Sequence, residues 1–257
     1  MRLADTPAAL RAGGQPDAVP AGHHRATMAA GGDPVFDAAV AALEAGRDEV
    51  TSTRDDLELE SWPAPKRLAP HAVALAATAY RDGDEAGEGK LMLLYDPSGQ
   101  DGWTGTFRIV VQVQADVDEE MAADPLLGEV GWSWLTEALD RHAPGYGAPS
   151  GTVTRVITEG YGGKADDPPS TGFELRASWC PADGGDGDED ADEIAAEIGG
   201  AVAAWCALLA SAAGLPAAGT LAIGSRATGA GSGLGPGLGS GSGLGSGSGL
   251  GSGRRRR

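Results

Sequence analysis

The stretch from residue 96 to residue 108 carries the side chains of this chain that are best suited to chemistry. Asp96 and Asp101 are two carboxylates in a glycine-rich turn, with Gln100 between them and with Trp103 and Arg108 following. Two carboxylates can act as the acid and the base of a hydrolase when the pKa of one of them is raised. The favoured alternative is a hairpin turn in which the Asp and Gly residues shape the backbone and the tryptophan covers a sheet edge. These five residues are candidates for binding, and none is assigned a catalytic role.

The sequence predicts no bound metal and no cofactor. His23 and His24 lie in a low-complexity arm, whereas His71 and His142 stand alone, so the spacing brings no three or four donors together. The acidic run 186–197 resembles a calcium-binding loop, but an alanine stands where the sharp turn of such a loop needs glycine. We interpret this run as a solvated loop that leads into an acidic helix start. The ordered part of the chain contains neither a dinucleotide-binding nor a phosphate-binding glycine motif.

Two tryptophans in one expected helix lead to a specific structural expectation. Trp132 and Trp134 lie two positions apart, which is about 200° around a helix, so their rings are expected on opposite sides. A helix that is apolar on two sides is buried on two sides. We expect one side against the sheet and the other against another element, such as the helix expected at 190–213, or against a second subunit. Trp134 is therefore a further candidate for binding.

The charge of the chain restricts its partners. The net charge is −18, and the segment 34–216 is more acidic still, with 11 Lys and Arg residues against 34 Asp and Glu residues. Such a surface repels nucleic-acid phosphates and anionic lipids. The folded part is therefore not expected to bind nucleic acid or membranes. A weak possibility of contact with RNA or an acidic partner rests on the terminal residues Arg254, Arg255, Arg256 and Arg257.

Composition divides the chain into three segments. Residues 1–33 have no sustained period and are expected to form a disordered arm, within which Met28 is an alternative start. Residues 217–257 are rich in Gly and Ser and are expected to form a disordered tail. Residues 34–216 are expected to form a single globular domain.

The apolar periodicity predicts an α+β fold with one antiparallel sheet of about six strands and three main helices. The clearest strand signal lies at 107–114, where Phe107, Ile109 and Val111 alternate with polar residues. Runs of strands joined by short turns favour this class over a doubly wound α/β fold. The expected order is helix, four strands, helix, two strands, helix. The helices are expected at 34–46, 124–142 and 190–213, and the strands at 57–60, 72–81, 91–95, 107–114, 152–159 and 172–180.

A cytoplasmic location is expected from two features. The N-terminal residues contain no apolar segment of signal-peptide length, and no run approaches the ~18 apolar residues of a membrane span. Cys180 and Cys206 are too few for a disulfide framework or a zinc site, so we expect reduced thiols in the core.

Three segments of the chain carry a resemblance to a known family, namely DPSGQDGWTGTFR, MAADPLLGEVGWSWLTEAL and PSGTVTRV. They resemble an uncharacterised family of high-GC Gram-positive bacteria, domain of unknown function 3000, and the similarity extends over roughly 36–215. The resemblance implies a cytoplasmic, single-domain protein and supplies no catalytic residues. Through a gene neighbourhood with ribonuclease D-type enzymes, it also implies an accessory role in RNA metabolism as one hypothesis.

The leading functional hypothesis is a non-enzymatic protein-binding module of the adaptor or chaperone kind. Either a protein partner or a second copy of the chain, in a homodimer, is compatible with this hypothesis. The order of elements is similar to that of small acidic peptide-binding chaperones of type III secretion, which is an analogy of fold only. The alternative is a small hydrolase-like enzyme that uses Asp96 and Asp101. A pocket in which either carboxylate meets Arg108 or a histidine would favour the enzyme, and an exposed apolar patch around Trp134 would favour the module.

Overall fold

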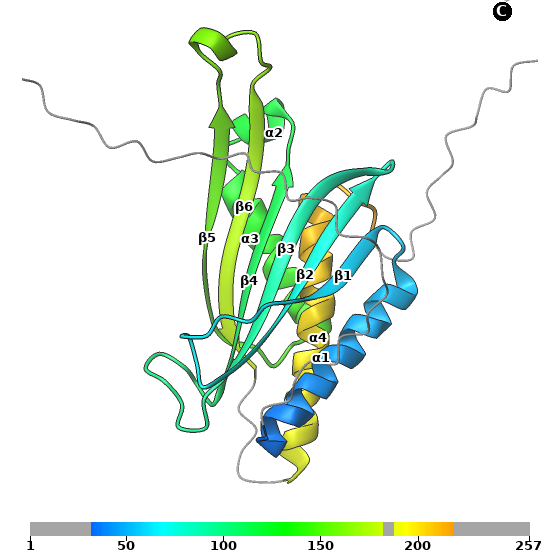
Figure 1. Ribbon diagram of the computed structural model, residues 1–257, viewed down its shortest axis with the longest axis vertical. Helices are drawn as coiled ribbons and strands as arrows, with labels where there is room; N and C mark the ends of the chain where they lie inside the picture. Colours follow the sequence, from blue (N-terminus) through cyan, green and yellow to red (C-terminus); the bar gives the residue numbers. More distant parts are fainter. Residues whose placement is uncertain (1–31, 182–187, 218–257) are drawn as a thin grey trace, which may run out of the picture. The chain divides into compact units, whose positions relative to one another are not determined.

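The computed structural model describes residues 32–181 and 188–217 (Figure 1). All of these residues belong to the first of two compact units, Met1–Thr220. The expected N-terminal arm and C-terminal tail, including the four terminal arginines, lie almost wholly outside the described residues, and so does the start of the acidic run near Asp186. The elements are α1 (Pro34–Thr53), β1 (Leu57–Trp62), β2 (His71–Arg81), β3 (Asp84–Tyr95), β4 (Phe107–Asp116), α2 (Glu119–Ala123), α3 (Leu127–His142), β5 (Gly147–Thr158), η1 (Gly162–Lys164), β6 (Ser170–Cys180) and α4 (Asp188–Ala212).

The six strands form one open sheet in the order β1-β2-β3-β4-β6-β5. Every neighbouring pair is antiparallel, so the predicted α+β class with a single antiparallel sheet is confirmed. The chain leaves β4, passes through α2 and α3, forms β5 at the edge and returns through β6 into the gap beside β4. The strand that follows α3 is therefore an edge strand, which the order of elements along the chain did not predict.

The long helices α1, α3 and α4 cover one face of the sheet (Figure 1). On β4, Phe107, Ile109 and Val113 point into this helical layer and are buried, while the residues between them are only partly buried on the other face. This alternation matches the period of a strand with one buried face. We call the face opposite the helices the outer face.

Helix α4 is the centre of the helical layer because it contacts both α1 and α3. Trp205 of α4 is fully buried, and its indole Nε1 donates a hydrogen bond of 3.5 Å to the Gln112 carbonyl of β4. A Cβ at Gly89 of β3 would stand 2.8 Å from this nitrogen. The indole therefore packs directly against the backbone of Gly89 in β3.

The predicted end of the first helix at Gly46 is wrong, since α1 continues to Thr53. A Cβ on Gly46 would stand 2.5 Å from the carbonyl oxygen of Gly199 in α4. The glycine therefore permits the backbones of two helices to approach closely, and it does not act as a C-cap. A glycine inside a helix has this packing role or a capping role, and the local sequence does not distinguish them.

Strand β3 is longer than predicted, because it begins at Asp84 and not near Leu91. The turn before it consists of Asp82 and Gly83, whose φ angles of 56° and 94° suit a tight hairpin. The segment that was missed reads DEAGEGK, in which the glycines and charges obscure the strand pattern.

The helix predicted over 124–142 is confirmed as α3, and a short helix before it, α2, was not predicted. Helix α2 ends with Asp124 as its C-cap, and α3 begins at Leu127. The short helix was missed because α2 is only five residues long, too short for an apolar period to be recognised. The remaining elements lie where they were predicted, with ends that differ by a few residues.

Helix α4 also contains a stretch, Asp192–Ala212, that is long and apolar enough to cross a membrane by length and composition alone. The expectation that no run approaches this length overlooked it. A core helix passes the same test, and 56% of the most apolar window is buried in the fold. One such helix is weak evidence for a membrane span.

Substitution of Gly46 by alanine tests the close contact between α1 and α4. An alanine inside a helix normally stabilises it by up to about 1 kcal/mol relative to glycine. We expect Gly46→Ala instead to lower the free energy of unfolding by about 1–3 kcal/mol, because the methyl group overlaps the backbone of α4. Urea unfolding measures this difference. The matched control is Gly128→Ala in α3, where the methyl group meets open space and should not destabilise.

The buried Glu197 of α4 should make the stability of the fold depend on pH. Its side chain is buried, and burial raises the pKa of its carboxyl above the ordinary 4.5, although a hydrogen bond from the Gly145 N–H acts in the opposite direction. A raised pKa in the fold means that the folded state binds the proton more tightly than the unfolded chain. The free energy of unfolding should therefore fall as the pH rises from about 4.5 through the raised pKa.

Glu197→Gln should remove this slope and increase stability at pH 7 relative to the parent, while changing little at pH 4. Urea unfolding across this pH range measures it. The same change at the exposed Glu137 of α3 serves as the control and should leave the slope in place.

Candidate functional site

The outer face of the sheet carries no helix among the described residues, and it has two different halves. At one end the connection 63–70 crosses the sheet (Figure 1), and Ala74 and Leu94 of the outer face are only 1% and 3% exposed. At the other end, toward the tip where β5 meets η1, the outer face is open. The open half is where a partner can reach the sheet.

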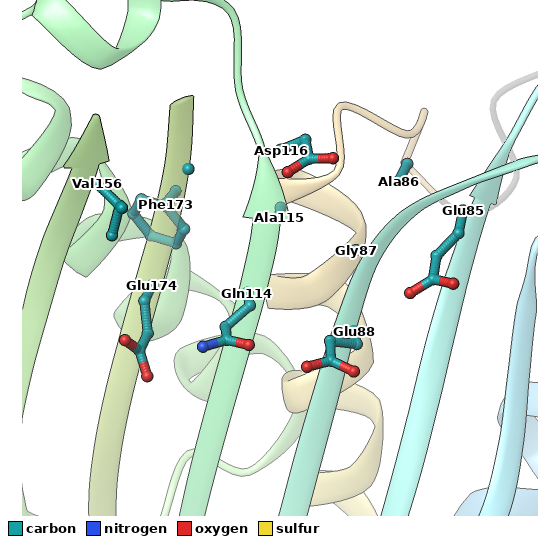
Figure 2. Close-up of a pocket in the computed structure, with 11 residues that line it drawn as sticks. Glu85, Ala86, Gly87, Glu88, Gln114, Ala115, Asp116, Val156, Phe173 and Glu174 are labelled. Carbon is teal, nitrogen blue, oxygen red and sulfur yellow. The ribbon is translucent and has the colours of Figure 1, made fainter. Parts of the chain in front are cut away.

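A hollow of about 330 Å³ lies on this open half (Figure 2). Register places Glu88 of β3, Gln114 of β4 and Glu174 of β6 in one row across three strands. Glu85 and Asp116 also border the hollow, and Val156 of β5 closes one side. We call this site, lined by the carboxylates of Glu85, Glu88, Asp116 and Glu174, the acidic hollow.

The charge of the acidic hollow is only partly compensated. Glu174 accepts hydrogen bonds from Gln112 and Arg176, and the latter is an ion pair. Within the described part of the chain, Glu85, Glu88 and Asp116 form no ion pair. These carboxylates attract cationic groups, since the surrounding surface holds few positive charges.

Strand β5 is the edge of the sheet next to the acidic hollow. It pairs with β6 alone, and its residues 151–158 read GTVTRVIT, with a single charge. That charge, Arg155, donates to the carbonyls of Ala122 and Asp124, on the side of the helices. Val156 and Ile157 are 43% and 62% exposed. We call residues 151–158 the free edge.

The opposite edge of the sheet is protected in the usual ways. Strand β1 has only six residues, two of which are Glu58 and Glu60, and a proline follows it at 63. Short length, charge and proline all prevent another strand from pairing with an edge. Strand β5 has a proline at 149 and an irregular register between Gly147 and Ser150, but both precede the free edge, which carries one charge, Arg155. The two edges of one sheet are therefore unequal, and only one of them is open to strand addition.

The structure assigns Asp96 and Gln100 to the architecture of their turn. The carboxylate of Asp96 accepts from the Ser98 N–H at 3.0 Å and from the Gln100 amide at 3.1 Å. The same amide donates to the Leu68 carbonyl, also at 3.1 Å. The turn is thereby tied to the connection 63–70 that covers one end of the outer face. This is the turn interpretation that the sequence favoured.

Asp101, Trp103 and Arg108 do not converge with Asp96 on a common point. The side chain of Asp101 is exposed, and Trp103 is half-buried, with its backbone N–H donating to the Gln100 carbonyl. Arg108 donates elsewhere, to the Gly102 carbonyl, the hydroxyls of Ser150 and Ser178 and the Cys180 sulfur. No acid–base pair is formed, and the hydrolase hypothesis receives no support from this geometry.

The expectation for Trp132 and Trp134 is wrong in one respect, because both rings lie toward the same layer. The ring of Trp134 packs against the ring of Phe173 in β6, with 5.7 Å between the ring centroids and 59° between the ring planes. A Cβ on Gly151 of β5 would stand 2.8 Å from the Trp132 ring. Gly131 allows both contacts, because its lack of a side chain lets α3 approach the sheet closely. A Cβ at this position would stand 2.6 Å from the Phe173 ring.

Helix α3 therefore contacts the sheet most closely at Gly131, and the two tryptophan rings lie on either side of this contact. Trp132 lies about 100° to one side of Gly131 and Trp134 about 60° to the other. Both tryptophans are partly buried against the core, so Trp134 has an internal partner. It does not form the exposed apolar patch that would have indicated an interface.

The acidic hollow and the free edge were missed by the sequence analysis. The hollow joins residues of β3 and β6 that are more than 80 positions apart, and only the strand order brings them together. The free edge had a usable signal, because GTVTRVIT is rich in β-branched residues and poor in charge. Its position at an edge was not predictable from that signal.

Comparison with known proteins assigns a family. A family model described as "Protein of unknown function (DUF3000)" matches residues 33–221, which spans every described element from α1 to α4. The chain belongs to the DUF3000 family. No curated protein and no solved structure matches it. Membership brings no known activity to this DUF3000 chain.

The turn of this DUF3000 chain offers a direct test of the role of its two carboxylates. Asp96→Ala removes two hydrogen bonds that hold the turn and should cost about 1–2 kcal/mol of unfolding free energy. Asp101→Ala removes an exposed side chain and should change stability by less than about 0.5 kcal/mol. Thermal or urea unfolding measures both. Equal effects of the two substitutions would contradict the structural role given to Asp96.

Proposed function

We propose that this DUF3000 member is a non-enzymatic protein-binding module that adds an extended segment of a partner to the free edge of β5. The observation that carries the proposal is the uncovered, weakly charged run Gly151–Thr158 at the edge of the sheet. Its backbone N–H and C=O groups that point away from β6 are available for a further strand. Extended peptides bind to such edges through main-chain hydrogen bonds, and adjacent pockets select their side chains.

The acidic hollow supports a basic partner segment. A strand added to β5 lies about 5 Å from it, and thus about 10 Å from β6. Glu174 of β6 pairs across from Thr154 of β5, so both side chains are on the outer face. A Lys or Arg opposite Thr154 would point to the same face, and its long side chain can extend toward Glu174. The charges of the hollow therefore favour a partner in which basic and apolar residues alternate.

The same charges disfavour pairing of β5 with a second copy of the chain. Each copy carries a net charge of −18 and would bring its own acidic hollow to the junction. Like charges that meet at an interface suppress association. We therefore assign the free edge to a partner of opposite charge, and a homodimer is the less favoured occupant.

A designed pair of peptides tests this function. The probe is an eight-residue peptide in which Arg alternates with Val, labelled for fluorescence anisotropy, and its counterpart has Glu in place of Arg. We expect saturable binding of the Arg peptide only, because the hollow repels the Glu peptide. Ile157→Lys places a charge on the free edge and should weaken binding of the Arg peptide by about fivefold.

The matched control is Ser61→Lys, which adds the same charge on the protected edge of β1 and should leave the affinity unchanged. Glu174→Gln should reduce the affinity two- to threefold, roughly the contribution of an exposed charge pair. Equal binding of the Arg and Glu peptides, or equal loss in the two lysine variants, would contradict strand addition at β5. If sedimentation equilibrium shows that the parent is a dimer and that Ile157→Lys is a monomer, the free edge would instead be assigned to a second copy of the chain.

A further inference from the structure

The free edge has a second face, on the side of the helices, that an added strand would also meet. Successive residues of a strand point to opposite faces, so Gly151 and Val153 lie on the helix side and Thr154 lies on the outer side. Register agrees, since Val153 pairs with the buried Leu175 of β6 and Gly151 with the buried Ala177. One extended segment at this edge would therefore place alternate side chains against two different surfaces.

Gly151 leaves a gap on the helix side of the free edge, and Trp132 of α3 occupies it. Gly151 is exposed, and a Cβ on it would stand 2.8 Å from the Cζ3 atom of the Trp132 ring. The ring therefore lies where a side chain of the edge strand would otherwise be. Trp132 is itself only half-buried, so part of its surface remains accessible.

An added strand would bring one of its side chains to this ring. Residues directly opposite each other in neighbouring strands have Cβ atoms about 4.5–5.5 Å apart. The partner residue opposite Gly151 therefore has its Cβ about 5 Å from the point where the Trp132 ring lies. Aromatic rings pack with their centroids about 4.5–7 Å apart, so a Phe, Tyr or Trp at this position reaches Trp132. A small side chain would leave the ring uncovered.

The surroundings of this ring favour an aromatic side chain over a cationic one. Gly131 and Val153 lie beside it, and a Cβ on Gly131 would stand 3.8 Å from Val153. The one charge of the free edge, Arg155, lies on this side of β5 and is positive. A partner cation gains no opposite charge from the free edge here, whereas on the outer side it faces Glu174. Its desolvation against apolar groups would be uncompensated.

We infer, on the basis of the proposed strand addition at β5, that the partner segment carries an aromatic residue three positions from a basic one. The aromatic residue lies opposite Gly151 and contacts Trp132. The basic residue lies opposite Thr154 and faces Glu174, which pairs across from Thr154. Gly151 and Thr154 are three positions apart and on opposite faces, so a spacing of three satisfies both contacts together.

Other spacings satisfy only one of the two contacts. Residues two or four positions apart in a strand lie on the same face, so an aromatic residue at those spacings would share the outer face with the basic one. The order of the two residues depends on the direction of the added strand. An antiparallel partner runs against β5 and has the basic residue first, whereas a parallel partner has the aromatic residue first.

The experiment is a competition series on the full chain, with the labelled Arg peptide as the probe. The competitors are eight-residue Thr peptides that contain one Arg and one Phe, two, three or four positions apart, each in both orders. We expect the better peptide of spacing three to displace the probe at about fivefold lower concentration than any peptide of spacing two or four. Only this peptide contacts Trp132 and Glu174 at the same time.

Trp132→Leu should reduce this fivefold advantage to less than twofold, because the aromatic contact is lost while an apolar side chain remains. The matched control is Trp62→Leu, which removes an exposed tryptophan at the end of the protected edge and should keep the advantage. Thermal melts should confirm that both variants are folded. The spacing series uses the parent chain, so it decides the question even if Trp132→Leu does not fold.

Two results would overturn the inference while strand addition at β5 stands. One is saturable binding of the labelled Arg peptide, weakened by Ile157→Lys, with no advantage for spacing three. The other is an advantage that Trp132→Leu leaves at fivefold. If neither the labelled peptide nor any competitor binds, the inference and the proposed function are both overturned.

Discussion

The close contact of α4 with its neighbours is the constraint on which the rest of the structure depends. Helix α4 approaches α1 where Gly46 faces Gly199, and it lies on the sheet where Trp205 meets Gly89. At each point a backbone without a side chain meets another group at van der Waals distance. Dispersion attraction falls steeply with separation, so these short distances make the helical layer dense. Only small residues are compatible with such an arrangement.

This dense layer also explains the asymmetry of the molecule. Three helices are enough to cover one face of a six-stranded sheet, and the described chain has no further long helix for the other face. The outer face is instead protected at one end by the connection 63–70, which the turn at Asp96 holds through Gln100. The Asp96 turn thus limits the accessible part of the face to the end that carries the acidic hollow.

The acidic hollow gives the outer face a charge that a ligand must match. It is built from carboxylates on neighbouring strands. The net charge of −18 disfavours anionic ligands as well. A proposed basic segment suits both, since a charge pair a few ångströms apart outweighs distant charges that solvent screens.

The sequence by itself determined the class of fold, because period-two and period-3.6 patterns are local. The alternation at 107–114 and the apolar spacing of α4 each depend on residues within one element, and the structure agrees with both. Several features were beyond local patterns. Gly46 was taken for a helix end, and the two tryptophans of α3 were expected on opposite layers. In both cases the deciding group, Gly199 or Phe173, lies far away in the chain.

Only the tertiary structure decided where the candidate sites are. Strand order put β5 at an edge and placed Glu88 and Glu174 on either side of Gln114 in one row. These outcomes follow from which surfaces bury the most apolar area once the whole chain is assembled. A local pattern contains no information on that choice, whereas it does specify which residues of each element point inward. The sequence therefore determined the elements and their buried sides, and the packing of those sides determined the sites.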